Sequence, residues 1–207
     1  MERRRLRIAV FASGSGSNFQ AIMEKIKAGE LSASAELLVC DRPEAPVVEK
    51  ARKFGVPTFV FRAKDYPSRE AYEKEILQKL NEKKVELVVL AGYMRLLTET
   101  LVKPYEGRMI NIHPSLLPAF PGMDGIGQAL RYGVKVTGVT VHFVDHGMDT
   151  GPIIAQRVVE VKDDDDENSL AERIHAVEHE LYPFVIEQFA RGKIHLSGRK
   201  VTMKPYD

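Results

Sequence analysis

The sequence predicts an α/β fold: one Rossmann-like domain whose open twisted sheet is mostly parallel, with an antiparallel C-terminal edge and helices on both faces. Two observations predict it. Up to residue 113, short and nearly continuous apolar runs alternate with amphipathic segments, which is typical of buried parallel strands joined by helices. Beyond residue 135, two longer valine-rich runs follow each other closely, which indicates antiparallel strands at one edge.

Each expected element has a local signal. The expected parallel strands are short apolar runs at 6–12, 36–40, 58–61, 85–92 and 108–113. The helices between them have apolar residues at helical spacing and cover 18–30, 44–55 and 68–83. The antiparallel runs are 135–145 and 152–161. We expect the acidic run 163–168 to lead into an amphipathic helix at about 168–191, and 194–202 to form a small hairpin.

Bulk properties argue against several classes of protein. The chain has 207 residues with 30 basic and 29 acidic side chains, so its net charge near +1 gives no reason to expect a nucleic-acid or membrane partner. No apolar run reaches the roughly 18 residues that a membrane span needs. The single cysteine, Cys40, excludes an internal disulfide framework and fits a reducing compartment, so we expect a cytoplasmic protein. We find no repeat or linker and expect residues 1–207 to form a single domain.

A glycine-rich loop, ASGSGSN at 12–18, follows the first expected strand. Gly14 and Gly16 allow a tight turn, and the free amides at the start of the next helix favour an anion. Open α/β sheets bind ligands at the carboxyl ends of their strands, so the position favours a phosphate site over an ordinary connection. The loop matches neither G-x-G-x-x-G, because residue 19 is Phe, nor a Walker loop. Asp41, near the end of the second strand, keeps dinucleotide binding open as an alternative.

The stretch MINIHPSLLPAFPG at 109–122 places polar residues at the end of a buried strand. Asn111 and His113 are two residues apart, so on a strand they face the same side, and Pro114 keeps the backbone of His113 extended. An amide beside an imidazole suits acyl transfer, because the amide stabilises an oxyanion while the imidazole moves protons. A single histidine near a strand end is also compatible with a purely structural role.

A carboxylate beside a catalytic histidine favours the imidazolium form. The glycine-rich segment DHGMDTGPII at 145–154 offers two carboxylates, Asp145 and Asp149. Spacing alone neither chooses between them nor excludes a polar hairpin loop. His142 alternates with apolar neighbours, and it either supports the site or lies on the surface.

Four stretches occur in the order found in the glycinamide ribonucleotide formyltransferases: ASGSGSN, LAGYMRLL, NIHPSLLPAFPG and HGMDTGPII. The chain resembles that family from about residue 6 to residue 190, and NIHPSLLP is highly specific to folate-dependent formyltransferases. The resemblance implies the formyltransferase fold and an enzyme of purine biosynthesis. It implies transfer of a formyl group from the cosubstrate 10-formyltetrahydrofolate to the glycine amine of N1-(5-phospho-β-D-ribosyl)glycinamide. It also implies small-molecule partners, no metal, and a monomer or homodimer.

The same resemblance assigns roles to residues of this chain. The catalytic residues would be Asn111, His113 and Asp149. The ribonucleotide phosphate would lie on Gly16, Ser17 and Asn18, and Glu178 would meet the amine end of that substrate. The folate site would be formed by Arg69, Met94, Arg95, Leu96, Leu97 and Asn111. The domain would then have a phosphate-binding half at about 6–105, a folate and catalytic half at about 106–190, and a tail at 191–207.

Several alternatives stay open. Methionyl-tRNA formyltransferase and formyltetrahydrofolate deformylase share the Asn-x-His core, but each normally carries a further domain, for which we expect no room here. HAVEH at 175–179 matches H-x-x-E-H, a zinc-hydrolase motif if a third ligand is present. A non-catalytic nucleotide-binding module would need neither Asn111 nor His113. Many relatives have histidine where this chain has Asp124, so no substrate contact of that histidine is carried over.

Overall fold

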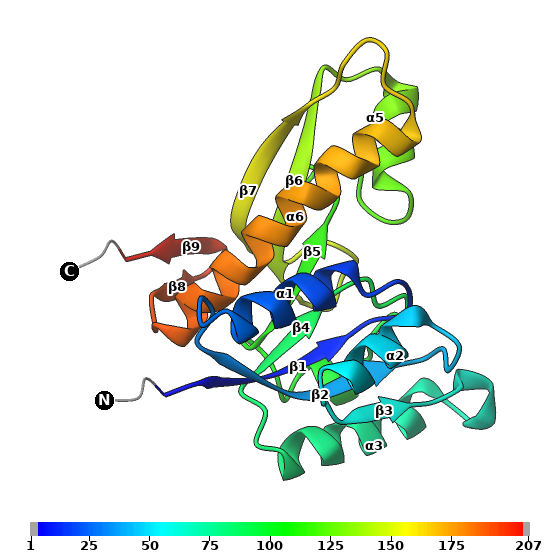
Figure 1. The fold of residues 1–207 in the computed structure, drawn as a ribbon, viewed down its shortest axis with the longest axis vertical. Helices are drawn as coiled ribbons and strands as arrows, with labels where there is room; N and C mark the ends of the chain where they lie inside the picture. Colours follow the sequence, from blue (N-terminus) through cyan, green and yellow to red (C-terminus); the bar gives the residue numbers. More distant parts are fainter. Residues whose placement is uncertain (1–3, 205–207) are drawn as a thin grey trace.

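The computed structural model describes residues 4–204, and seven strands in that range form one sheet (Figure 1). Its order is β3-β2-β1-β4-β5-β6-β7, parallel as far as β5 and antiparallel for β6 and β7. The strands of the sheet are β1 Leu6–Phe11, β2 Ala33–Cys40, β3 Thr58–Val60, β4 Leu87–Leu90, β5 Met109–His113, β6 Val136–Phe143 and β7 Ile153–Glu160. The expected hairpin forms separately from β8 Ile194–Ser197 and β9 Lys200–Met203. The predicted fold class is confirmed; residues 1–3 and 205–207 of the expected domain lie outside the described residues.

Helices pack on both faces of this sheet (Figure 1). They are α1 Ser17–Lys27, α2 Pro46–Lys53, α3 Arg69–Glu82, α4 Glu99–Val102, α5 Gly125–Tyr132 and α6 Glu167–Ala190, with a 3-10 turn at Ala63–Asp65. Between residues 4 and 204, no helix combines the length and the apolar character that crossing a membrane requires.

The central strand β1 shows why the apolar runs are continuous. Ile8 and Val10 join the core beneath α1 and α6, whereas Ala9 and Phe11 join the core beneath α3. Side chains alternate across a strand, so a strand covered by helices on both faces buries every position. The four residues are 0% exposed. Their burial holds β1 in place, and with it the point at which the loop after Phe11 leaves the sheet.

The acidic run 163–168 leads into α6, the longest helix of the described range. The side chain of Asp166 accepts a hydrogen bond from the Ser169 amide at 2.8 Å, and the Ser169 hydroxyl accepts one from the Asp166 amide at 3.0 Å. This capping box satisfies amides that the first turn leaves free. Farther along, the buried hydroxyl of Tyr182 donates to the carbonyl of Leu90 at 2.6 Å, which fixes α6 over the end of β4.

Two short helices, α4 and α5, were not individually predicted. α5 contains Gly125 and Gly127, which lower helix propensity and weaken a periodic signal. The helix is also stabilised at its ends. The side chain of Asp124 accepts from the amide of Gly127 at 3.2 Å and lies 3.1 Å from Arg131, and Gly133 ends the helix with a left-handed backbone. Asp124 therefore has a structural role in starting α5.

Candidate active site

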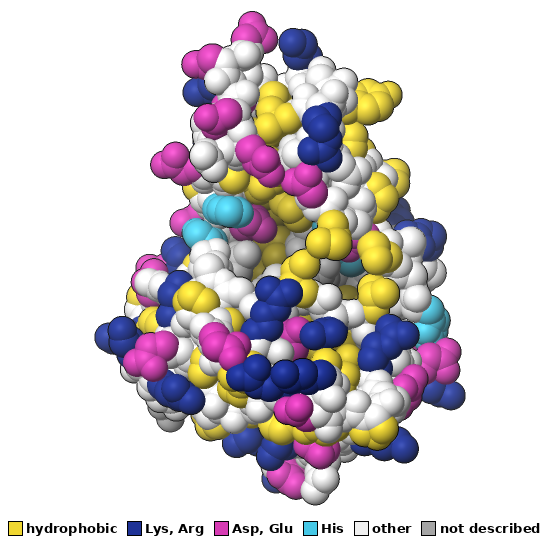
Figure 2. Space-filling view, turned by 90° about the vertical axis from the view of Figure 1, so that its right-hand side faces the viewer, with side chains coloured by type: hydrophobic (Ala, Val, Ile, Leu, Met, Phe, Trp, Pro, Cys, Tyr) yellow, Lys and Arg dark blue, Asp and Glu magenta, His cyan; other side chains and the backbone are white. Residues whose placement is uncertain are grey.

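The loops that follow β1, β4 and β5 meet at the carboxyl edge of the sheet. The chain runs from β1 outward to β3 and then returns to β4 on the other side of β1, so the strand order reverses between β1 and β4. Open α/β sheets bind their ligands at such a reversal. Figure 2 shows the corresponding face as hollowed between two lobes, with hydrophobic side chains in and around the depression and basic side chains below it.

Asn111 and His113 lie at the end of β5, as predicted. The antiparallel register with β6 places Asn111 opposite His142 and His113 opposite Thr140. The side-chain nitrogen Nδ2 of Asn111 lies 3.4 Å from Nε2 of His142. Two adjacent strands thus bring an amide and two imidazoles together at the carboxyl edge.

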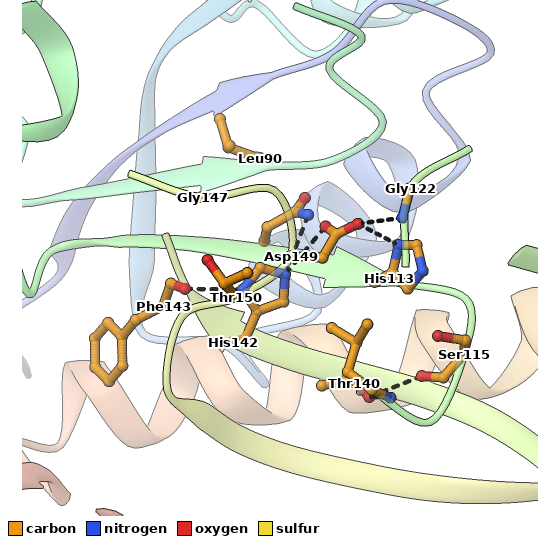
Figure 3. Close-up of polar contacts among 12 residues, drawn as sticks. Leu90, His113, Ser115, Gly122, Thr140, His142, Phe143, Gly147, Asp149 and Thr150 are labelled. Atoms are coloured by element: carbon orange, nitrogen blue, oxygen red, sulfur yellow. Dashed lines mark hydrogen bonds and ion pairs between the residues drawn. The ribbon is translucent and has the colours of Figure 1, made fainter. Parts of the chain in front are cut away.

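Asp149, from the loop between β6 and β7, points at both histidines (Figure 3). Its Oδ2 lies 3.6 Å from Nδ1 of His113, and its Oδ1 lies 3.7 Å from Nε2 of His142. The amide of Gly122 donates a hydrogen bond to Oδ2 at 2.8 Å. One carboxylate therefore links the loop after β5 to both imidazoles.

Asp145, the other carboxylate of this loop, bonds within the loop itself. It accepts from the amide of Gly147 at 3.0 Å and from the hydroxyl of Thr150 at 2.6 Å. Asp149 has a left-handed backbone with φ of 55°, a conformation that aspartate adopts more readily than most residues. The choice that spacing left open is thus made by the loop, which turns Asp149 toward His113 and Asp145 toward its own backbone.

The carboxyl group of Asp149 is held in its ionised form. Its burial acts to raise the pKa, but the contact with His142, the Gly122 amide and the charge of His113 together hold that pKa below its ordinary value. The site consequently keeps a negative charge beside two imidazole rings at neutral pH.

His113 is buried, and its ring is oriented from both sides. Nε2 lies 2.8 Å from the carbonyl oxygen of Phe120, and because a carbonyl only accepts, Nε2 carries a hydrogen. Nδ1 is then the nitrogen that faces Asp149. When Nδ1 is protonated as well, both N–H groups have an acceptor within reach. The ring is thus held between the Phe120 carbonyl and the Asp149 carboxylate.

His142 is a member of this cluster that the sequence left undecided. It is 2% exposed, so it does not lie on the surface. Its Nδ1 donates to the carbonyl of Phe143 at 2.8 Å, which leaves Nε2 directed at Asn111 and Asp149. The strand pairing would have revealed this role, but the pairing register is not readable from the sequence.

The loop 12–18 passes directly into α1, with Gly16 as the residue before the helix. Gly16 has φ of 74°, and a Cβ added to it would lie 2.5 Å from Cγ2 of Val47. The carbonyl oxygen Oδ1 of the Asn18 side chain is buried and has no hydrogen-bond partner within residues 4–204. The first turn of α1 carries no acidic residue, so its free amides present a positive end to an anion.

Glu178 of α6 reaches the same loop. Burial raises its pKa to about 7, although a hydrogen bond with Asn18 opposes that rise. Its Oε1 lies 3.8 Å from Nε2 of His175. A carboxyl group beside the loop 12–18 thus changes charge near neutral pH.

The segment after β4 forms another side of the hollow. Met94 and Leu96 are 51% and 55% exposed, so this segment presents two large apolar side chains to solvent. Glu73 of α3 holds the end of the segment by accepting from the amide of Thr98 at 2.9 Å. Arg69, exposed at the start of α3, interacts electrostatically with Glu73 and so lies beside the same segment.

Comparison with known proteins decides the family. Residues 6–186 match the family described as formyl transferase. The chain belongs to the formyl transferase family. It is 55% identical to phosphoribosylglycinamide formyltransferase of Bacillus subtilis over 182 residues, 88% of this chain and 93% of that protein. It is 42% identical to the trifunctional purine biosynthetic protein adenosine-3 of Drosophila melanogaster over 199 residues, 95% of this chain and 15% of that protein. The crystal structure of glycinamide ribonucleotide transformylase 1 from Geobacillus kaustophilus matches with a TM-score of 0.88 and 59% identity, covering 90% of this chain and 99% of that chain.

In this formyl transferase the HAVEH segment lies within α6. The rings of His175 and His179 stack with their centroids 6.5 Å apart. Across the described part of the chain, no group of three His, Cys, Asp or Glu side chains is placed to hold a metal ion. Glu178, which the motif would use as a catalytic base, instead faces Asn18.

Proposed function

We propose that this formyl transferase moves the formyl group of 10-formyltetrahydrofolate to the glycine amine of N1-(5-phospho-β-D-ribosyl)glycinamide, as a step of purine biosynthesis. The observation that carries the proposal is the cluster of Asn111, His113 and Asp149, at the same edge of the sheet as a phosphate-type loop and an exposed apolar segment. The names of the relatives that match along most of this chain support the same reaction.

The ribonucleotide binds along the first half of the chain, about 6–105, in this proposal. Its phosphate accepts hydrogen bonds from the amides of Gly16, Ser17 and Asn18 at the start of α1. Glu178, beside Asn18, meets the amine end as a carboxylate. The phosphate thereby anchors the substrate while its amine points toward β5.

The folate-derived donor binds across the second half, about 106–190, and the segment after β4. The exposed side chains of Met94 and Leu96, together with Leu97, cover its ring system, and Asn111 reaches its formyl end. The guanidinium groups of Arg69 and Arg95 suit its anionic tail. The formyl carbon then lies between the acceptor amine and the polar cluster.

The reaction follows from these positions. The amine nitrogen attacks the formyl carbon, and the carbonyl electron pair moves to oxygen. The amide of Asn111 and the positive charge of the protonated His113 ring stabilise that oxyanion. The C–N10 bond then breaks as the carbonyl re-forms, and the proton lost by the attacking nitrogen reaches N10 through His113 or water. Asp149 balances the imidazolium charge and fixes the ring that carries it.

The test is a spectrophotometric assay of purified protein with 10-formyl-5,8-dideazafolate and the ribonucleotide. We expect release of the deformylated folate only when both substrates are present. Release without the ribonucleotide would identify a deformylase, and release that requires methionyl-tRNA would identify the alternative acceptor. Absence of turnover with every acceptor would contradict the proposal.

The Gly16→Ala variant tests the phosphate loop. We expect the KM for the ribonucleotide to rise about tenfold, because a left-handed non-glycine residue costs roughly 1–2 kcal/mol and the new Cβ displaces Val47. The matched control is Gly14→Ala, since a Cβ at Gly14 meets nothing within 4 Å. Its KM should stay within about threefold of wild type, as expected for a substitution without strain. Equal effects of the two substitutions would count against the proposed role of Gly16.

The raised pKa of Glu178 predicts a pH effect on acceptor binding. The carboxyl is mostly neutral below pH 7 and mostly ionised above it, since its pKa is about 7. If the carboxylate binds the amine end, the KM for the ribonucleotide should fall about tenfold between pH 6 and pH 8, the change in the ionised fraction over that range. The Glu178→Gln variant should lose this dependence. Glu187→Gln is the control, because Glu187 lies on the same helix but bonds to the amide of Ser32 and to Arg191.

The pH dependence of the free energy of unfolding tests the raised pKa of Glu178 independently of substrate binding. The pKa of Glu178 is raised above its ordinary value of 4.5, so the folded state holds the proton more tightly than the unfolded chain. Its contribution is therefore fully present below about pH 4.5 and is lost as the pH rises through about 7. The loss amounts to about 3 kcal/mol. Glu178→Gln should thus gain stability relative to wild type between pH 5 and pH 8, and a constant difference would contradict the assignment.

A further inference from the structure

Asp41, at the end of β2, connects two loops of the hollow through one buried carboxylate. Its side chain is 0% exposed. Oδ1 accepts a hydrogen bond from the hydroxyl of Ser13, and Oδ2 accepts one from Nε of Arg95 at 2.8 Å. A buried carboxylate is stable only when it is paired and hydrogen-bonded. Asp41 therefore holds both partners in place, and each partner belongs to a different loop.

Ser13 carries this connection into the backbone. Its amide donates to the carbonyl of Gly92 at 3.1 Å, and its hydroxyl oxygen accepts from the amide of Met94 at 2.9 Å. The loop 12–18 and the segment after β4 are thus joined both through main-chain groups and through the Asp41 carboxylate. Because Ser13 uses its donor and its acceptor at once, moving either loop disturbs the other.

Arg95 is the exposed end of this network, and it lies on the segment after β4 that the proposed function assigns to the folate-derived formyl donor. Arg95 is anchored by Nε to Asp41, yet its side chain remains 42% exposed. The anchored guanidinium has one orientation to offer an anionic group, since the Asp41 contact removes much of the rotational freedom of a long side chain. An ordered loop 12–18 therefore also means an ordered Arg95.

We propose that Asp41 is a positioning residue that couples the acceptor and donor sites, so that the binding of one substrate raises the affinity for the other. The inference rests on the proposed function, which assigns Gly16 to Asn18 to the phosphate and Met94 to Leu97 to the folate. Phosphate binding orders the loop that contains Ser13, and the Ser13–Asp41 network transmits that order to Met94 and Arg95. Linkage requires the effect to be the same in both directions.

The experiment measures coupling directly. The Kd of 5,8-dideazafolate, which carries no formyl group to transfer, is determined by calorimetry with and without saturating ribonucleotide. We expect the ribonucleotide to tighten binding at least about fivefold in wild type, the lower end of usual coupling strengths. Asp41→Asn keeps an oxygen for Ser13 but turns an N–H group toward Arg95, so the ratio of the two Kd values should fall to near one. Ser13→Ala, which leaves Asp41 intact, should do the same.

Glu44→Gln is the matched control. Glu44 follows the same strand, but it is exposed and pairs with Arg62 outside both loops. This variant should keep the wild-type ratio. A ratio near one in wild type, or a wild-type ratio in both Asp41→Asn and Ser13→Ala, would overturn the proposal. A lower melting temperature with an unchanged ratio would likewise leave Asp41 a purely structural role. Failure of the proposed function is distinguishable, because the same calorimetry would then show no binding of the ribonucleotide to wild type.

Discussion

The His113→Asn variant is expected to lose about a thousandfold in kcat, within the range of 10²–10⁴ that general acid–base groups contribute. Asparagine has about the reach of the first ring nitrogen and donates a hydrogen bond, but it neither carries a positive charge nor transfers a proton at neutral pH. Two contributions of His113 therefore disappear together: charge opposite the oxyanion and the proton route to N10. The KM values for both substrates should stay within about threefold, because these contributions are made mainly in the transition state.

The measurement is steady-state kinetics in both substrates, with melting temperatures to show that the variant is folded. His146→Asn serves as the control. His146 lies in the same sheet-edge loop as Asp149, but it is exposed and faces Glu99 at 3.7 Å. That variant should keep at least about half of the wild-type kcat, as is usual for exposed substitutions away from the chemistry. More than a tenth of wild-type kcat in His113→Asn would show that the ring is structural.

The sequence predicts the sheet well because each parallel strand is marked by a local run of apolar residues. Burial on both faces makes β1 apolar at Ile8, Ala9, Val10 and Phe11 alike, and this run needs no knowledge of the rest of the chain. The spacing of Asn111 and His113 is local in the same way, because the period of a strand places them on one side.

Other parts of the site depend on contacts that the local sequence does not carry. His142 enters the cluster through its pairing with Asn111, and a shift of one residue in that register would turn it to the opposite face. The choice between Asp145 and Asp149 depends on the left-handed backbone of Asp149, which the loop as a whole imposes. α5 is missed because Gly125 and Gly127 lower its helix propensity, while its caps and its packing depend on the folded chain.

Asp149→Asn should lower kcat by about a thousandfold, close to the loss in His113→Asn, because both variants disable one charged unit. Asparagine is the informative replacement here. It tolerates the left-handed backbone at least as well as aspartate, so the φ of 55° adds no strain. It keeps an oxygen that accepts from the Gly122 amide, and it removes the charge that faces Nδ1 of His113 and Nε2 of His142.

Asp145→Asn separates this role from mere support of the loop. Its carboxylate lies in the same loop but bonds to Gly147 and Thr150, so its loss weakens the loop without removing the charge beside the histidines. We expect its kcat to fall no more than about tenfold, because the groups that act on the transition state remain in place. Equal losses in the two variants would mean that loop geometry, and not charge, is what Asp149 supplies.

The pH dependence of the free energy of unfolding tests whether the folded protein favours the charged form of Asp149. The pKa of Asp149 is lowered, so its carboxylate stabilises the folded state above its unfolded pKa near 4, and that contribution is lost as the pH falls through the lower folded value. The free energy of unfolding of Asp149→Asn should therefore lie below that of wild type at pH 7, and the difference should narrow toward pH 3. A difference that stays constant over this range would show that folding does not lower the pKa of Asp149, so the contacts with Gly122, His113 and His142 would not favour its carboxylate. The proposed pairing of the Asp149 carboxylate with the imidazolium of His113 would then be contradicted.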